Sequence, residues 1–249
     1  TRRNATLFAV NPLVFLVAAL IGYLFGSFPT GYFAGRLWGI DVRKHGSGRT
    51  GGSNVLRSAG WGAFAVTGLG DLFKGSLANL LVKFLLPDAT DAHAFAVYFV
   101  LLGHVWSVWI ALMAKPDPRV AIQPGIAGAI QSLAERGRGG AGVAPTVGAI
   151  LVLFPPLVAI VAIFPLAALI LSGYSSVGSL TASVIAPVVM LYFALTGSAP
   201  WSYFIVISAA CVTIIVLHAP NIARLRAGTE RRFGQRLGRK TIKSSEKES

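Results

Sequence analysis

The sequence predicts an all-α fold: a polytopic membrane helix bundle with about seven transmembrane helices, the N-terminus outside and the C-terminus cytoplasmic. Composition and charge predict it. Hydrophobic residues make up 54% of the 249 residues and charged residues only 12%, whereas a soluble domain carries about 25% charged residues. The net charge of +13 is typical of proteins that bind nucleic acid or an anionic membrane surface, and the apolar excess favours the membrane.

The apolar residues are gathered in long runs. A helix that crosses a hydrocarbon core of about 30 Å needs roughly 20 apolar residues. The fourth of the candidate runs is short, and two prolines follow it, so the fourth and fifth runs form either a tight helical hairpin or one kinked helix. The seven predicted spans are 9–25, 61–86, 92–114, 142–154, 156–172, 177–196 and 201–218.

The positive charges predict the orientation, because Lys and Arg accumulate in short cytoplasmic loops. Segments 36–57, 115–138 and 221–249 together hold 18 of the 22 Lys and Arg residues, whereas segment 87–91 carries two aspartates and no basic residue. Seven crossings with the N-terminus outside place all three basic segments in the cytoplasm. Six crossings would place the C-terminal segment on the opposite side. We therefore expect a multi-pass protein of the cell inner (plasma) membrane.

The chain is expected to form one transmembrane domain, residues 1–223, followed by a basic cytoplasmic tail, residues 224–249. The single cysteine, Cys211, excludes an intrachain disulfide and a thiolate zinc cluster. The sequence has no His-Glu-x-x-His helix and no carboxylate cluster suited to magnesium. We predict no metal and no cofactor.

The loop at 39–57 has the composition of a phosphate site. Its glycines Gly46, Gly48, Gly51 and Gly52 can adopt positive φ, which would turn successive amides into one concavity. Neutral donors and guanidinium groups that can bind phosphate oxygens surround them. The composition is equally compatible with a flexible, positively charged loop. The candidate ligands are Arg43, Ser47, Arg49, Thr50, Ser53, Asn54 and Arg57.

A second glycine-rich stretch, residues 136–144, opens the fourth predicted span on the same side of the membrane. A helix begins there, and its exposed amides and dipole favour an anion. The alternative is a helix entry kept thin by small residues for close packing. We expect phosphate binding at this stretch too.

Ionisable residues inside spans are costly and commonly functional. Asp71 and Lys74 share a helical face and are expected to form an internal pair, and His104 is expected to bond a backbone carbonyl. His218 and Asn221 share a face at the cytoplasmic end of the last span, where they either bind a polar substrate or cap the helix. With no Gly-x-Ser-x-Gly elbow, we expect binding, orientation and charge neutralisation rather than a catalytic triad.

Short motifs in order along the chain resemble one family, the integral-membrane glycerol-3-phosphate acyltransferases of bacteria that use acyl phosphate as donor. Each motif is short, but their shared order across seven spans is specific. The motifs are Gly26-Ser-Phe-Pro29, Asp41-Val-Arg43, Gly46-Ser-Gly48, Ser53-Asn54-Val-Leu-Arg57, Asp71-Leu-Phe-Lys-Gly75, Gly103-His104, Gly139-Gly140 with Gly142-Val-Ala144, Ser176 with Ser179, His218, Asn221-Ile-Ala-Arg-Leu225 and Gly228-Thr-Glu230.

The resemblance implies that the 1-hydroxyl of glycerol 3-phosphate attacks an acyl phosphate, giving 1-acylglycerol 3-phosphate and phosphate in phospholipid synthesis. It implies membrane lipids but no nucleic acid as partners, and a substrate phosphate as proton acceptor. Oligomeric state and acyl-chain preference stay open. The implied catalytic residues are Ser47, Arg57, His218 and Asn221. The substrate- and phosphate-binding residues are expected to be Arg43, Gly46, Gly48, Arg49, Ser53, Asn54, Arg138, Gly139, Gly140, Gly142 and Ser179.

The chain departs from the family pattern in several places. Arg49 stands where the family has Asn, and Ala141 replaces a lysine of the second glycine motif. An extra stretch of residues, 116–135, precedes that motif. We hypothesise that Arg49 and Arg138 compensate for the missing lysine.

Two alternatives remain at this point. The substitution at Ala141 fits a divergent member that binds phosphorylated lipid precursors without acyl transfer. The intramembrane Asp71 and Lys74 fit a small-solute transporter, although the sequence shows no inverted repeat and the candidate residues gather at one face rather than at the midplane.

Overall fold

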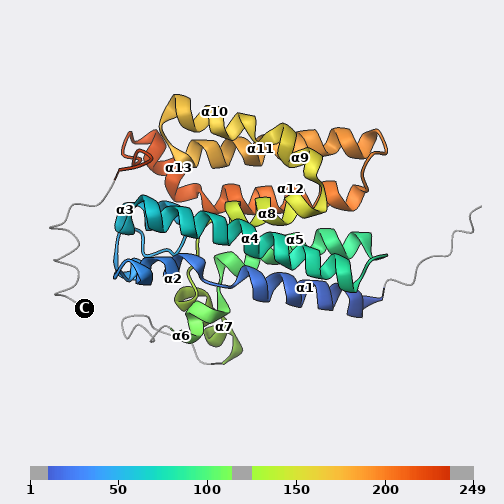
Figure 1. Ribbon diagram of the computed structural model, residues 1–249, viewed down its shortest axis with the longest axis horizontal. Helices are drawn as coiled ribbons and strands as arrows, with labels where there is room; N and C mark the ends of the chain where they lie inside the picture. The colour runs from blue at the N-terminus through green and yellow to red at the C-terminus, as the bar shows by residue number, and fades with distance from the viewer. Residues whose placement is uncertain (1–10, 114–124, 236–249) are drawn as a thin grey trace, which may run out of the picture.

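The computed structural model describes residues 11–113 and 125–235, and all regular structure in these two ranges is helical (Figure 1). The long helices lie side by side along the longest axis of the molecule. The elements are α1 (Pro12–Gly26), α2 (Thr30–Leu37), the 3-10 helix η1 (Val42–Lys44), α3 (Gly52–Ala59), α4 (Trp61–Leu85), α5 (Thr90–Val105), α6 (Val108–Met113), α7 (Ile126–Arg136), α8 (Val143–Leu153), α9 (Pro155–Val161), α10 (Ile163–Ser172), α11 (Ser175–Leu195), α12 (Trp201–Leu217) and α13 (Ala219–Arg226).

Among the described residues, three helical segments are long and apolar enough to cross a membrane: Pro12–Leu37, Pro155–Ser172 and Ser175–Leu195. A fourth arises if α12 and α13, which meet at a bend of 51°, form one span. Large apolar side chains cover the outside of the bundle. Leu171 is 86% exposed and Phe84 is 80% exposed, which suits a surface that faces lipid.

The predicted spans coincide with helices to within three residues at most ends, but the run at 92–114 does not form one helix. It breaks at Trp106–Ser107 into α5 and α6. The Ser107 amide donates to the Gly137 carbonyl at 2.8 Å, and the Gly139 amide donates to the Val105 carbonyl at 2.9 Å. The second glycine stretch thus pairs with the chain at this break, a long-range contact that hydropathy cannot register.

The choice between a hairpin and a kinked helix for the fourth and fifth spans is decided in favour of the hairpin. Val143 at the start of α8 and Leu169 near the end of α10 line the same cavities, so the chain reverses between them. The reversal lies at Phe154, after which Pro155 and Pro156 begin α9. Lys83 on α4 donates to the carbonyl of Val152 at 2.6 Å, where α8 ends.

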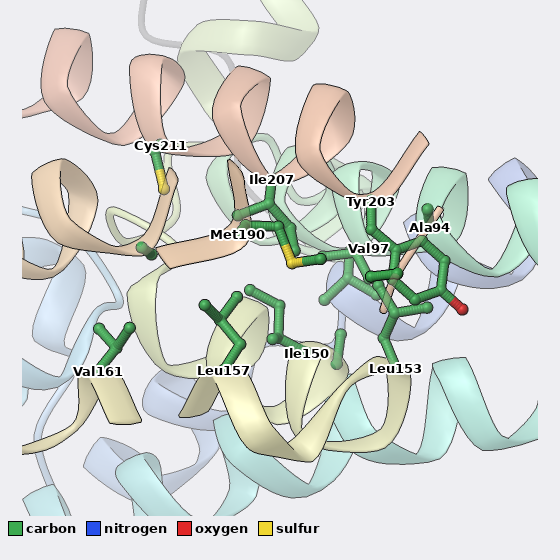
Figure 2. Packing of buried hydrophobic residues seen from close by; sticks show 14 of the residues in the cluster. Ala94, Val97, Ile150, Leu153, Leu157, Val161, Met190, Tyr203, Ile207 and Cys211 are labelled. Carbon is green, nitrogen blue, oxygen red and sulfur yellow. The ribbon is translucent and has the colours of Figure 1, made fainter. Parts of the chain in front are cut away.

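The helices pack through small residues. This is common in membranes, because lipid tails are as apolar as the side chains and close packing replaces the hydrophobic effect in holding helices together. A methyl group on Gly75 of α4 would lie 1.9 Å from the Pro145 carbonyl oxygen of α8. Figure 2 shows the apolar cluster that holds the α8–α9 hairpin against α11 and α12, with Met190 and Ile207 at its centre.

Four shorter helices, α2, α3, α7 and α13, were not among the predicted spans. The helix α7 occupies the later part of the extra stretch 116–135, and it packs against α6. Residues 116–124 lie outside the described ranges. The helix α13 crosses the boundary expected at 223/224, and Arg224 within it donates to Glu230, so the start of the predicted tail has regular structure.

Candidate active site

A cavity of about 570 Å³ lies where α3, α4, α11 and α13 meet the two glycine loops. Its wall combines guanidinium groups, hydroxyls and backbone from segments distant in the sequence. Of the predicted site residues, Arg43, Gly46, Gly48, Thr50 and Gly139 are not in this wall. The others line it: Ser47, Arg49, Ser53, Asn54, Arg57, Arg138, Gly140, Gly142, Ser179, His218 and Asn221.

Asn54 organises the first glycine loop. Its Nδ2 group donates to three loop carbonyl oxygens, those of Val42, His45 and Arg49, at 2.9, 3.0 and 2.8 Å. Its Oδ1 atom accepts from the Ser47 amide at 2.9 Å. Because the amide group is buried and fully bonded, we revise the prediction for Asn54: it shapes the loop and has no spare donor for phosphate.

The predicted backbone conformation of the loop is correct for two of its four glycines. Gly46 and Gly48 have φ of 62° and 69°, a region that other residues avoid. Gly51 has φ of −75°, and neither Gly51 nor Gly52 has positive φ. These two glycines begin α3 instead, so the amides at the start of that helix face the cavity with the positive end of the helix dipole.

Arg43 lies away from the cavity wall. Its guanidinium donates to both carboxylate oxygens of Asp41, at 3.0 and 2.8 Å, and stacks 4.5 Å from the centre of the Tyr32 ring. Burial opposes ionisation of Asp41, but the hydrogen bonds from Arg43 outweigh it and hold the pKa of Asp41 below its usual range. The predicted phosphate role of Arg43 is therefore corrected to a structural one that anchors the loop to α2.

Positive charge exceeds negative charge in the cavity wall, where Arg49, Arg57, Arg138 and Arg224 lie with one carboxylate, Asp71, among the described residues. Burial lowers the pKa of Arg49, and the nearby Arg138 and Arg224 lower it further. Burial likewise lowers the pKa of Arg57, with Arg231 adding to the effect. Such a cluster is stabilised by an anion. Arg49 and Arg138 line the same cavity as Ala141, where the family lysine is missing.

Glu230 belongs to one of the short motifs, but no site role was predicted for it. Its side chain is 2% exposed and accepts hydrogen bonds from Asn221 at 2.8 Å, Arg224 at 2.7 Å and Ser176 at 3.1 Å. Burial would raise the pKa of Glu230, but these hydrogen bonds lower it below its usual range. Glu230 thereby ties α13 to α11 and orients Asn221. The sequence signal that could have indicated this role is a carboxylate within a basic segment.

His218 caps α12, one of the two roles left open for it, and it also lines the cavity. Its Nδ1 atom lies 2.8 Å from the Ile214 carbonyl oxygen. A carbonyl only accepts, so Nδ1 carries the proton and Nε2 of a neutral ring offers a lone pair. Asn221 points its Nδ2 group at Glu230, and its Oδ1 atom has no partner among the described residues.

A second cavity, of about 390 Å³ and almost wholly apolar, adjoins the basic one. It lies between the α8–α9–α10 segment and helices α11 and α12, beside the cluster seen in Figure 2. The two cavities share four lining residues, Val143, Leu169, Ser175 and Ser179. An elongated ligand with an anionic head and an apolar tail fits this arrangement.

Of the two contacts expected for ionisable residues inside the spans, the structure shows the first and replaces the second. Lys74 lies 2.8 Å from Asp71, the predicted internal pair. His104 contacts Lys74 instead of a backbone carbonyl, with 2.9 Å between Nδ1 and Nζ. Across the described ranges, no group of three or more His, Cys, Asp or Glu residues could hold a metal ion.

The family model described as glycerol-3-phosphate acyltransferase matches residues 16–114 and 120–228. The chain belongs to the glycerol-3-phosphate acyltransferase family. A family member from Thermus thermophilus is 38% identical over 218 residues, 88% of this chain and 94% of the relative. Glycerol-3-phosphate acyltransferase 2 of Moorella thermoacetica is 35% identical over 225 residues, 90% of this chain and 100% of the relative.

The fold matches a solved glycerol-3-phosphate acyltransferase. The crystal structure of PlsY (YgiH), an integral membrane glycerol 3-phosphate acyltransferase, in its glycerol 3-phosphate form has a TM-score of 0.70 and 25% identity, covering 88% of this chain and 95% of that chain. The lysophosphatidic acid form of PlsY has a TM-score of 0.69 and shares the fold. The resemblance drawn from the motifs is thus confirmed: this is a membrane-embedded acyltransferase of phospholipid synthesis.

Proposed function

We propose that the protein transfers a fatty acyl chain from acyl phosphate to the 1-hydroxyl of glycerol 3-phosphate, releasing 1-acylglycerol 3-phosphate and inorganic phosphate. One observation carries the choice of donor. The basic cavity around Arg49, Arg57 and Arg138 adjoins the apolar cavity through shared residues, so an acyl phosphate can place its phosphate in one and its chain in the other. Glycerol 3-phosphate, the ligand named for the PlsY structure, supplies the second anion.

The proposed topology has seven crossings, with the N-terminus outside and the C-terminus in the cytoplasm of the inner membrane. It places the basic segments 36–57 and 221–249 in the cytoplasm. Both segments contribute residues to the basic cavity, among them Ser47 and Asn221. The soluble substrate would therefore enter from the cytoplasm and the acyl donor from the membrane.

In the proposed reaction the chain orients and neutralises its substrates. Arg49, Arg57 and Arg138 bind phosphate oxygens, and a guanidinium suits them because it donates two parallel hydrogen bonds. The hydroxyls of Ser47, Ser53 and Ser179 add neutral donors, and the backbone at Gly140 and Gly142 allows close approach. Binding both substrates in one cavity makes the transfer effectively intramolecular.

The hydroxyl group of glycerol 3-phosphate is proposed to lie beside His218 and Asn221, whose Nε2 and Oδ1 atoms are the free acceptors. Its oxygen attacks the acyl carbonyl carbon, and the bond from that carbon to the phosphate oxygen breaks. The hydroxyl proton leaves with inorganic phosphate. Three guanidinium groups stabilise the charge that develops on the leaving phosphate.

Turnover by the purified full chain in detergent or lipid tests this proposal. Glycerol 3-phosphate and a long-chain acyl phosphate are supplied, and release of phosphate and lysophosphatidate is followed together, with acyl-CoA as a parallel donor. Matched release of both products from acyl phosphate alone supports the proposal. Activity with acyl-CoA would assign a different donor. Folded protein that binds substrate but gives no product would favour the divergent binding role.

The use of the apolar cavity is tested by filling it. Ala182 lines that cavity but not the basic one, so Ala182→Phe is expected to raise the KM for long-chain acyl phosphate and leave the KM for glycerol 3-phosphate unchanged. Leu16→Phe on the exposed face of α1 is the matched control. For topology, single cysteines at Ser47, Arg57 and Asn221 in a Cys211-free background should label from the cytoplasm only. Labelling from both sides would favour alternating access.

A further inference from the structure

Three buried ionisable side chains lie at the floor of the basic cavity, which Asp71 and His104 line, and the proposed reaction gives them no role. Asp71 and Lys74 on α4 and His104 on α5 have side chains between 4% and 6% exposed. Asp71 accepts from Thr30, and Lys74 donates to the Phe28 carbonyl at 2.7 Å. The Asp71–Lys74 pair is therefore neutral overall and fully bonded to its surroundings.

The contact between Lys74 and His104 fixes the protonation of the histidine ring. A lysine ammonium has only donors, and its Nζ atom lies 2.9 Å from Nδ1 of His104. Nδ1 must therefore accept, so the ring is neutral and its proton is on Nε2. Asp71 Oδ1 lies 3.6 Å from the same Nδ1, too far to reverse this assignment. His218 has the opposite tautomer, with its proton on Nδ1.

The Nε2 atom of His104 faces the junction of the two glycine loops. A methyl group built on Gly140 would lie 2.5 Å from this Nε2 atom and 2.7 Å from the Cα atom of Gly51. His104 lines the basic cavity, and its Nε2 atom has no hydrogen-bond partner among the described residues. A buried N–H donor is thus presented beside the backbone of both loops.

We propose that the Nε2–H group of His104 donates a hydrogen bond to a phosphate oxygen bound between the two glycine loops, and that Asp71 and Lys74 are positioning residues that hold the ring in the donating tautomer. The inference rests on the proposed function, since it assigns a further ligand to the phosphate of glycerol 3-phosphate. The charge of Lys74 is already balanced by Asp71. The neutral Nε2–H group therefore adds a hydrogen bond to the phosphate without adding another buried charge.

Two substitutions separate a donor from a purely structural histidine. Gln in His104→Gln keeps an N–H group near the position of Nε2, whereas Leu in His104→Leu fills the space without a donor. We expect His104→Leu to raise the KM for glycerol 3-phosphate by about 10- to 100-fold, the loss expected for a hydrogen bond to a charged group. His104→Gln should stay within about threefold of the wild type.

Ligand-induced thermal stabilisation supplies a readout that does not depend on turnover. Glycerol 3-phosphate and inorganic phosphate are titrated separately. The wild type and His104→Gln should be stabilised by both, and His104→Leu should require higher concentrations. If glycerol 3-phosphate alone stabilises the wild type, the histidine serves that substrate only. Unchanged binding and kinetics in folded His104→Leu, or equal losses in both folded variants, would overturn the inference.

The tautomer itself can be measured in the wild-type protein by ¹⁵N NMR of labelled histidine, with His104→Gln used for assignment. We expect a neutral ring protonated on Nε2. A ring protonated on Nδ1 would overturn the inference even if His104→Leu did not fold. Wild-type protein that binds phosphate through this histidine but gives no product would count against the proposed reaction and not against this site.

Discussion

Gly51 and Gly140, which lie 89 positions apart in the sequence, touch through their backbones: a methyl group on Gly51 would lie 2.8 Å from the Cα atom of Gly140. This contact joins the start of α3 to the loop that precedes α8. Both segments thereby contribute backbone to the wall of one cavity. No residue larger than glycine fits at either position without separating the loops.

We predict that Gly140→Ala abolishes acyl transfer and destabilises the protein by about 1–3 kcal/mol, because the added methyl group overlaps Gly51 and the His104 ring. Turnover and thermal unfolding in the same detergent measure the two effects. Gly197→Ala is the matched control. Its φ of 71° makes alanine strained, but nothing lies within 4 Å, so stability should fall while turnover is retained. Wild-type activity in Gly140→Ala would contradict the proposed junction.

Removing one arginine from the guanidinium cluster is expected to raise stability without substrate and to weaken substrate binding. Arg49 and Arg138 repel each other in the substrate-free cavity. Arg49→Ala should therefore raise the melting temperature without substrate, while raising the KM for glycerol 3-phosphate about 10-fold or more. Arg138→Ala should act in the same direction. Unchanged affinity in both variants would refute the idea that they compensate for Ala141.

Restoring the family lysine provides the complementary test. Ala141 lines the same cavity as Arg49, so a lysine there can reach the bound phosphate. We expect Ala141→Lys to lower the KM of the Arg49→Ala variant at least threefold. Lys44→Ala, in the exposed part of the same loop, is the control for loss of one positive charge and should leave the KM unchanged.

The sequence predicted the long helices because hydropathy is a local property, and α4 and α12 begin at the predicted residues, Trp61 and Trp201. Together with the family resemblance, it also identified eleven of the residues that line the basic cavity. It could not predict that Asn54 is fully occupied by the loop carbonyls or that Arg43 is held by Asp41, because both depend on how the loop backbone turns. The hydrogen bond between Asn221 and Glu230 could not be predicted either, because it depends on the turn after α13.

Glu230 should make stability depend on pH. Its pKa is lower in the folded chain than the ordinary value of 4.5, so the unfolded chain binds more protons between the two values. The stabilisation is therefore complete above about pH 4.5 and is lost as the pH falls through the folded pKa. Comparing melting temperatures with Glu230→Gln should show a difference at about pH 7 that shrinks towards about pH 3. A constant difference would contradict this account.

Phe233 closes one side of the basic cavity. Its amide donates to the Gly173 carbonyl at 2.8 Å, and its ring lies 5.4 Å from that of Trp61 and 5.7 Å from that of Phe64, measured between ring centres. The segment after α13 thus bridges the end of α10 and the start of α4. Both Phe64 and Phe233 line the cavity. In the proposed reaction, an aromatic wall at this position limits the entry of water to the acyl phosphate.

We therefore expect Phe233→Ala to increase hydrolysis of acyl phosphate relative to transfer, because water can then compete with the glycerol hydroxyl. The measurement is the ratio of phosphate to lysophosphatidate released, which is 1 for pure transfer and should rise at least twofold. Phe233→Tyr keeps the ring and should keep the ratio near 1. Phe84→Ala removes a phenyl ring from the exposed surface near the other end of α4 and controls for general loosening. A ratio of 1 in folded Phe233→Ala would show that water is excluded by other groups.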